Sequence, residues 1–193
     1  MGGNRSKMSS ERIRGFEIVS RIKEDILLPK RNDDGSAGYD FYAIEDIDIY
    51  PIFPISNFIY SINSCIITPI IDFKNYEKID YKNIKPNHCT LVKTGIKAYM
   101  PKDEYLALYI RSSLAMKYGL SLVNNCGIVD SSYYNNESNE GEIGFLIINF
   151  STNTYHIKKG DKIGQGIFHK YSIIDDDITI NSNRVGGFGS SGI

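Results

Sequence analysis

The chain has 193 residues, is 41% hydrophobic and carries a formal net charge of -1, which fits one globular domain with a buried core rather than two. A charge so close to zero predicts no nucleic-acid or membrane partner, because binding to a polyanion needs Lys and Arg gathered on one face. Three widely spaced cysteines without a CxxC pair predict neither a disulfide framework nor a zinc site, so the expected compartment is the reducing cytoplasm.

The first ten residues, MGGNRSKMSS, predict a disordered leader in front of a single domain at 11–193. The leader lacks the apolar core of a secretory signal. Its Gly2 and Ser6 have the spacing of an N-myristoylation site, but a native tail or an expression scar is the favoured interpretation. No stretch reaches the roughly 20 apolar residues that a membrane-spanning helix needs.

Short runs of Ile, Val, Tyr, Phe and Thr, broken by Gly, Pro, Asn and Asp, predict an all-β domain. The run AIEDIDIY, at 43–50, alternates apolar and acidic residues, which is typical of a strand with one buried face. Further strands are predicted at 91–99, 105–110, 143–150 and 163–171. The segment 51–83 carries no chemical motif and is interpreted as an inserted hairpin that decorates the surface, with a partner site as the alternative.

One short helix is predicted in SSLAMKYG, which begins with two hydroxyl residues and ends at Gly119, where a left-handed cap would lie. Arg111, Ser112 and Ser113 open this helix, where free backbone N–H groups and the helix dipole favour an anion. We interpret the segment as a phosphate grip. A capped helix without a ligand is the alternative.

Two turn segments carry candidate catalytic groups. SAGYD ends at Asp40, whose carboxylate could hold a hydrated magnesium ion, since this ion prefers oxygen ligands and keeps several waters. In NNCGIVDSSY, Gly127 lets a ligand approach the backbone, and the Asn124 amide can donate and accept, as a pyrimidine edge demands. Asp130, beside a bound water, could act as a general base. The alternatives are a solvated aspartate and an Asx turn.

The chain ends in RVGGFGSSGI, which predicts a flexible C-terminal lid at about 181–193. A glycine-rich backbone can wrap a phosphate, while Phe188 can stack on a base and Arg184 can pair with phosphate. A plain linker is the alternative. His88, His156 and His169 show no ligand spacing, so they are assigned structural roles.

The order AGYD, RSSLAMKYG, GIVDSSY with GEI, GDKIGQGIF and RVGGFGSSG resembles the five motifs of the trimeric dUTP pyrophosphatases. The strand LVKTGIKAYM is also similar to the one before the second motif. The resemblance covers the chain from about residue 35 to its end, apart from the 51–83 insert. Two features depart from the family pattern: this insert, and the sequence YNNESNE, which lengthens the hairpin tip between Tyr133 and the GE pair.

The resemblance implies a jelly-roll-like distorted β-barrel with one short helix, assembled as a homotrimer with exchanged C-terminal arms. Each site would lie between subunits. One chain would supply the phosphate-binding residues, a second the hairpin 124–133 and a third its tail. The implied reaction is hydrolysis of dUTP to dUMP and pyrophosphate with Mg2+, which keeps uracil out of DNA and supplies dUMP for dTMP synthesis.

The resemblance also implies a role for each candidate residue. Asp130 would activate the water that attacks the α-phosphorus, Asn124 and the adjacent backbone would read uracil, and Tyr133 would pack on the deoxyribose and reject a ribose. Asp40 would reach the magnesium ion through water. The other implied substrate-binding residues are Arg111, Ser112, Ser113, Gly127, Ile128, Val129, Gln165, Arg184, Phe188, Gly189, Ser190 and Ser191.

Two alternatives remain open. A dCTP deaminase of the same fold would need a catalytic glutamate in the strand after the third motif, where GEIGFLIINF has Leu146 at the aligned position. A non-catalytic homologue could bind nucleotide, or hold a protein partner through the insert. The intact Asp130 and the intact tail count against this second alternative.

Overall fold

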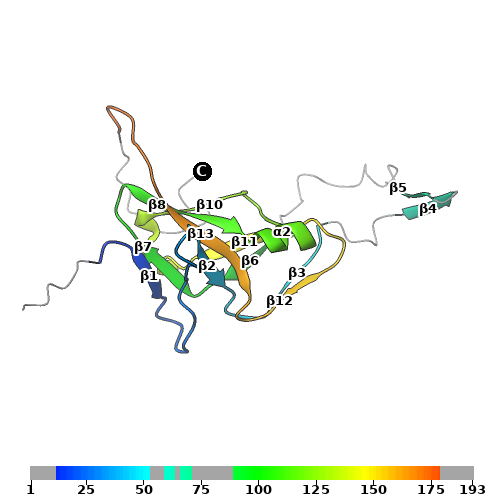
Figure 1. Cartoon of the computed structure of the whole chain (residues 1–193), viewed down its shortest axis with the longest axis horizontal. Helices are drawn as coiled ribbons and strands as arrows, with labels where there is room; N and C mark the ends of the chain where they lie inside the picture. The colour runs from blue at the N-terminus through cyan, green and yellow to red at the C-terminus, as the bar shows by residue number, and fades with distance from the viewer. Residues whose placement is uncertain (1–11, 53–58, 64–65, 71–88, 179–193) are drawn as a thin grey trace, which may run out of the picture.

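The computed structural model describes residues 12–52, 59–63, 66–70 and 89–178. The predicted leader and C-terminal lid, and much of the insert, lie outside these residues. In chain order the elements (Figure 1) are β1 (Gly15–Ile18), β2 (Tyr39–Tyr42), β3 (Ile47–Ile49), β4 (Ile59–Asn63), β5 (Ile66–Ile70), β6 (Cys89–Lys93), β7 (Ile96–Tyr99), β8 (Glu104–Ile110), α2 (Ser112–Tyr118), β9 (Leu120–Leu122), β10 (Gly127–Asp130), η2 (Ser131–Tyr133), β11 (Gly144–Asn149), β12 (Tyr155–Ile157) and β13 (Lys162–Lys170).

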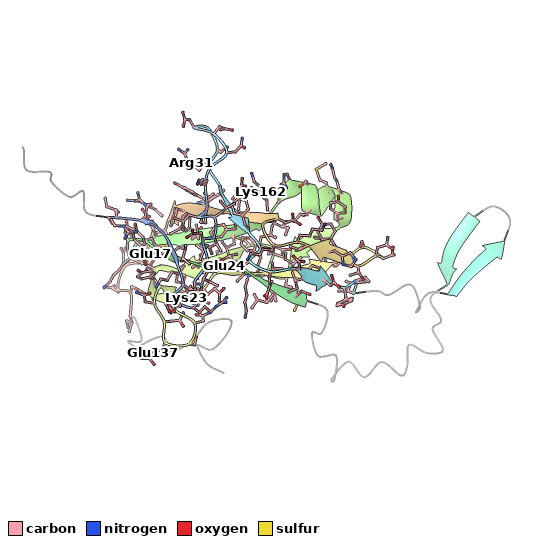
Figure 2. All side chains as sticks on the ribbon, turned by 90° about the horizontal axis from the view of Figure 1, so that it is seen from below. Glu17, Lys23, Glu24, Arg31, Glu137 and Lys162 are labelled. Carbon is pink, nitrogen blue, oxygen red and sulfur yellow. The ribbon has the colours of Figure 1, made fainter. Side chains whose placement is uncertain are left out.

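Two sheets form the body of the fold. One has the strand order β10-β8-β13-β2 and the other β6-β11-β9, while β1 pairs with β7, β12 with β3, and β4 with β5. All of these pairings are antiparallel, and most neighbours are not consecutive in the chain. These crossovers are those of a jelly-roll-like β fold. The loops that carry Arg31 and Glu137 project from opposite sides of this body (Figure 2).

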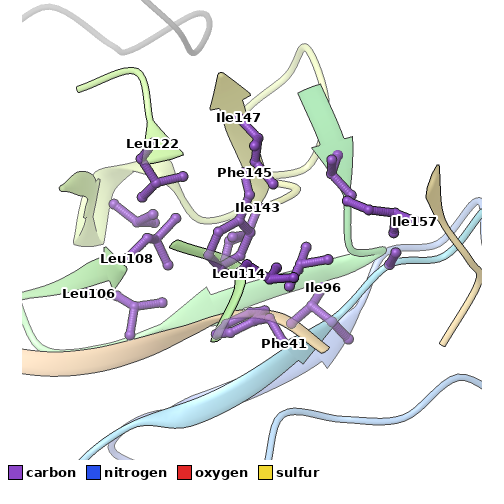
Figure 3. Close-up of a cluster of buried hydrophobic side chains, with 14 of the residues drawn as sticks. Phe41, Ile96, Leu106, Leu108, Leu114, Leu122, Ile143, Phe145, Ile147 and Ile157 are labelled. Carbon is purple, nitrogen blue, oxygen red and sulfur yellow. The ribbon is translucent and has the colours of Figure 1, made fainter. Parts of the chain in front are cut away.

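The hydrophobic core lies between the two main sheets. Leu106 and Leu108 of β8 face Leu122 of β9 and Phe145 of β11 across it (Figure 3). Along β11 the residues alternate between half-buried and buried, as expected for a strand with one face on the core. Complete burial of a side chain such as that of Phe145 stabilises the fold by about 1.5–3 kcal/mol.

The all-β prediction and the single short helix are confirmed in the described residues. The helix ends at Gly119, whose φ of 65° is the predicted left-handed cap. Its N-cap, however, is Arg111 in extended conformation, with no capping hydrogen bond from its side chain to the described chain. The two serines at the start of the segment therefore do not cap the helix, because Ser112 is already its first helical residue.

The predicted strands at 105–110, 143–150 and 163–171 correspond to β8, β11 and β13. The predicted strand 91–99 is split between β6 and β7, since Gly95 has a φ of 68°, which ends an extended run. Only β3 remains of the predicted strand 43–50, because the Ala43 backbone bonds to Asp161 and Gly160 instead of continuing a ladder. Within the insert, β4 and β5 form an antiparallel hairpin.

In the part of the chain that the structure describes, no helix combines the length and apolar character required to cross a membrane.

Candidate active site

A cavity of about 220 Å³ opens beside β10 and is here called the hairpin cavity. The predicted residues Asn124, Gly127, Ile128, Val129 and Tyr133 all line it. Its remaining lining residues are Leu108, Leu122, Glu142, Ile143, Gly144 and Leu146. The cavity is therefore apolar at its base and carries the Asn124 amide at its rim, which suits a flat, partly polar ring.

Local backbone geometry presents Asn124 at this rim. The next residue, Asn125, adopts a φ of 59°, and its N–H donates to the Leu122 carbonyl at 3.1 Å, so a tight turn separates β9 from β10. Gly127 then lies opposite Leu108, where a Cβ would approach the Leu108 side chain to 3.2 Å. Because Gly127 has no side chain, this part of the cavity stays open. Next to it, the Cys126 thiol donates to the Gly127 carbonyl at 3.7 Å, and its interaction with the Tyr109 phenol raises the pKa of that phenol.

Tyr133 forms a wall of the hairpin cavity and is only 6% exposed. Its hydroxyl donates to the Glu142 carbonyl at 3.1 Å and accepts from the Asn139 amide at 2.8 Å. Gly141 follows with a φ of 79° and lies so close that a Cβ there would be 2.4 Å from the Tyr133 carbonyl oxygen. The GE pair of the third motif is thus packed directly against the tyrosine.

Glu142 is a residue of this cavity that sequence reasoning missed. Its side chain is buried, with only 8% of its area exposed. The carboxylate pairs with the Arg21 guanidinium and accepts the Gly95 N–H at 3.0 Å. A buried carboxylate that is both paired and hydrogen-bonded is satisfied. Glu142 therefore links the cavity wall to the turn between β6 and β7. The GEI motif, which contains Glu142, is the sequence signal by which this residue could have been predicted.

A second cavity, of about 240 Å³, is here called the phosphate cavity. The predicted residues Asp40, Arg111, Ser112 and Gln165 line it together with Asn32, Lys162 and Gly164. Three chain segments meet here, because β13 pairs with β2 at Gln165 and Asp40 and also contacts the start of α2. The lining is polar with two cationic side chains, as phosphate binding requires. Ser113 is half-buried at the second helical position and is not part of this lining.

Lys162 is the other functional candidate that sequence reasoning missed. Its ammonium lies 2.7 Å from the Asp40 carboxylate, and this hydrogen bond raises the pKa of Lys162. The register of β13 shifts between Lys162 and Gly164. Because an extra residue reverses the alternation of a strand, this bulge brings Lys162 and Gln165 to one side of the sheet.

The metal chemistry available to this cavity is limited. The described residues contain no cluster of three His, Cys, Asp or Glu side chains that could hold an ion by themselves. Asp40 supplies one carboxylate beside cationic groups. One carboxylate together with substrate phosphates and waters is a usual environment for Mg2+, so the donor set fits an ion that arrives with a polyphosphate.

Asp130 does not line the phosphate cavity in the single chain, and it adjoins the hairpin cavity only through Ile128, which lines both that cavity and the hollow beside Asp130. It ends β10 and lines a hollow of about 360 Å³ with Tyr105, Ile128 and Tyr171. The hairpin and phosphate cavities share no lining residue among those described. Glu137, in the loop after Tyr133, and Lys162 of the phosphate cavity lie on opposite sides of the molecule (Figure 2). The predicted residues of the tail, from Arg184 onward, lie outside the described residues.

Gly141→Ala is expected to lower the free energy of unfolding by about 2–4 kcal/mol, because the left-handed conformation and the contact with Tyr133 both penalise a Cβ. Gly160 is a matched control: its φ is 86°, but no described atom lies within 4 Å of the place that a Cβ would take. Gly160→Ala should cost only about 1–2 kcal/mol. Urea unfolding at equal protein concentration measures both, and equal losses would contradict the packing of Gly141 on Tyr133.

Comparison with known proteins agrees with these features. A model of the dUTPase family matches residues 78–192. The deoxyuridine 5'-triphosphate nucleotidohydrolase of Lactococcus lactis subsp. lactis (strain IL1403) is 34% identical, with 94% of this chain and 99% of that protein covered. The protein of the same name from Treponema denticola is 30% identical, with 92% and 99% covered.

Solved structures give the same result. The crystal structure of the dUTPase from Streptococcus mutans superposes with a TM-score of 0.62 at 32% identity, covering 83% of this chain and 98% of that chain. A mutant dUTPase of phage phi11 of S. aureus, whose structure reveals the coordination of a structural Mg(II) ion, shares the fold at a TM-score of 0.55 and 17% identity, covering 86% of this chain and 95% of its own. The motif order, the two cavities and these relatives together establish that the chain belongs to the dUTPase family.

Proposed function

We propose that the protein hydrolyses dUTP to dUMP and pyrophosphate in a magnesium-assisted reaction. The observation that carries this proposal is the hairpin cavity, which Asn124 and the buried Tyr133 line together with apolar side chains. A uracil ring would lie in this cavity with its polar edge toward Asn124 and the backbone at Ile128 and Val129. The deoxyribose would pack on Tyr133, which leaves no room for a ribose 2′-hydroxyl.

The phosphates would bind at the polar cavity, where Arg111 offsets their negative charge and Ser112 and Gln165 donate hydrogen bonds to them. Ser113, which follows in the same helix, would reach the phosphates from outside the lining. Asp130 accepts a proton from a water molecule as the water oxygen forms a bond to the α-phosphorus. The bond from this phosphorus to the bridging oxygen breaks, and pyrophosphate leaves. Mg2+, when bound near Asp40, would supply charge neutralisation to the triphosphate. Catalysis of this kind rests on positioning, electrostatic stabilisation and one base.

The separation of the two cavities supports a homotrimer with its sites between subunits. Since Asp130 and the phosphate cavity do not converge in one chain, a neighbouring subunit is needed to bring them together. The tail would come from the third subunit, with Arg184, Phe188, Gly189, Ser190 and Ser191 closing over uracil and the terminal phosphate. Such a reaction would keep uracil out of DNA and supply dUMP for dTMP synthesis.

The alternative dCTP deaminase reaction has little support in the cavity. Leu146 lines the wall at the position aligned with the deaminase glutamate. Glu142, the acidic residue of the lining, has its carboxylate engaged by Arg21 and by the Gly95 N–H. Deamination therefore finds no available acid among the described residues of this cavity.

Pyrophosphate release from dUTP is therefore expected to depend on magnesium, with dTTP, dCTP and UTP as poor substrates. Coupled phosphate detection on each nucleotide, together with the mass of the native oligomer, tests both parts of the proposal. Release of ammonia from dCTP, or full activity of an isolated monomer, would contradict it.

A further inference from the structure

The extended hairpin tip, residues 134–140, forms an ordered loop whose contacts converge on Tyr133. Asn136 is 6% exposed, and its amide donates to the Tyr133 carbonyl at 2.9 Å. The side-chain oxygen of Asn136 accepts from the Ser138 N–H, the Ser138 hydroxyl and the Asn139 N–H at 2.7–3.2 Å. The loop therefore has a hydrogen-bonded interior of its own, which a loose surface extension would lack.

Asn139 connects this loop to the phenol. Its side-chain oxygen accepts from the Asn136 amide at 2.8 Å and from the Gly141 N–H at 3.1 Å. These two bonds leave its amide nitrogen directed at the Tyr133 hydroxyl, to which it donates at 2.8 Å. Since the same hydroxyl donates to the Glu142 carbonyl, the phenolic oxygen is held from two sides.

The far end of the loop is attached to the segment after β1. Glu140 accepts from the Ser20 N–H at 3.1–3.2 Å and from the Lys97 ammonium at 3.3 Å, and its pKa is lowered by Ser20 and Lys97. The Tyr134 hydroxyl donates to Glu17 at 2.6 Å. Asn139 thus lies between Glu140, which is bonded to Ser20 and Lys97, and Tyr133 in the wall of the hairpin cavity.

We propose that Asn139 is a positioning residue for sugar selection, in that its amide holds the Tyr133 ring where the ring excludes a 2′-hydroxyl. This inference rests on the role of Tyr133 in the proposed function. Steric exclusion of one oxygen atom is lost when the excluding ring is displaced by well below 1 Å. A packed interior prevents such a displacement only while the neighbouring side chains stay in place. Loss of one of the two hydrogen bonds to the Tyr133 hydroxyl lets the ring move aside. The affinity for a ribose nucleotide then increases more than the affinity for a deoxyribose nucleotide.

Asn139→Asp tests this inference with little disturbance of the loop. An aspartate keeps the oxygen that accepts from Asn136 and Gly141 but, when ionised, has no proton to donate to Tyr133. The phenol has a single proton, which it can give either to this carboxylate or to the Glu142 carbonyl, so Tyr133 keeps only one of its two hydrogen bonds. Equilibrium binding of dUMP and UMP, measured by calorimetry on the full chain, gives the sugar preference as a ratio of Kd values. The preference for dUMP is expected to fall about fivefold, the size of one hydrogen bond.

Ser138→Ala is the matched control, because it removes a hydrogen bond of the same loop without touching Tyr133. It should keep the native preference. In a Tyr133→Phe background the acceptor of the Asn139 amide is gone, so Asn139→Asp should then have no further effect on the ratio. An unchanged ratio in Asn139→Asp, or an undiminished effect in the Tyr133→Phe background, would overturn the inference.

The binding ratio also separates this inference from the proposed function. A native protein that prefers dUMP but does not hydrolyse dUTP would contradict the proposed function alone. A native protein that hydrolyses dUTP but binds dUMP and UMP equally would overturn the roles of Tyr133 and Asn139 in sugar selection.

Discussion

Asp130→Asn is expected to lower kcat for dUTP by about a thousandfold, within the range for removal of a general base. Asparagine has nearly the same shape as aspartate but cannot take the proton from the attacking water. The position supports this expectation, since Asp130 is half-buried at the end of β10 and borders an open hollow. Steady-state turnover of dUTP at saturating magnesium measures the effect.

Asp103→Asn provides the matched control. Asp103 is an exposed aspartate, and its pairing with Lys170 at 3.5 Å is of the kind that contributes little. Its replacement should leave turnover unchanged. Both variants should bind dUMP with native affinity and unfold at native urea concentrations. If Asp130→Asn kept full turnover, Asp130 would not be the base. If instead it lost turnover together with stability, its role would be structural.

Much of the fold follows from local sequence patterns. The alternation of residues in β11 and the left-handed Gly119 are both visible in the sequence, because each is set by its own few residues. The break at Gly95 and the loss of most of the predicted strand 43–50 have another origin. They depend on hydrogen bonds from Ala43 to the segment around Asp161, and on those that join the Gly95 backbone to Val19 and Glu142, and such distant partners leave no local signal.

The candidate site shows the same division. Asn124, Gly127 and Tyr133 lie in one continuous motif, and the structure places them around one cavity. Lys162 was not predicted because the bulge in β13 alters which residues share a face. Glu142 was not predicted because its importance comes from burial and from Arg21, which is 121 positions away in the chain. A role that depends on a bulge or on a distant partner can be recognised only from the three-dimensional structure.

Truncation of the C-terminal tail is expected to have the second large effect on turnover. Removal of residues 184–193 is expected to leave a folded trimer whose turnover of dUTP is lower by about a thousandfold. The truncated enzyme would lack the Arg184 charge on the phosphates, and charges of this kind contribute on this scale in phosphoryl transfer. It would also lack the Phe188 ring that covers the base. Size-exclusion mass and dUTP turnover of the same preparation measure the two parts of the expectation.

A mixture of two inactive chains shows whose site the tail closes. The truncated chain keeps Asp130, and the full-length Asp130→Asn chain keeps its tail. When the two are refolded together, mixed trimers should regain activity, because a site can then combine Asp130 of one subunit with the tail of another. If each tail closed over the Asp130 of its own chain, no combination would contain a complete site, and the mixture would stay as inactive as its components. Recovery of activity on mixing therefore requires that the subunits share each site through an exchanged arm.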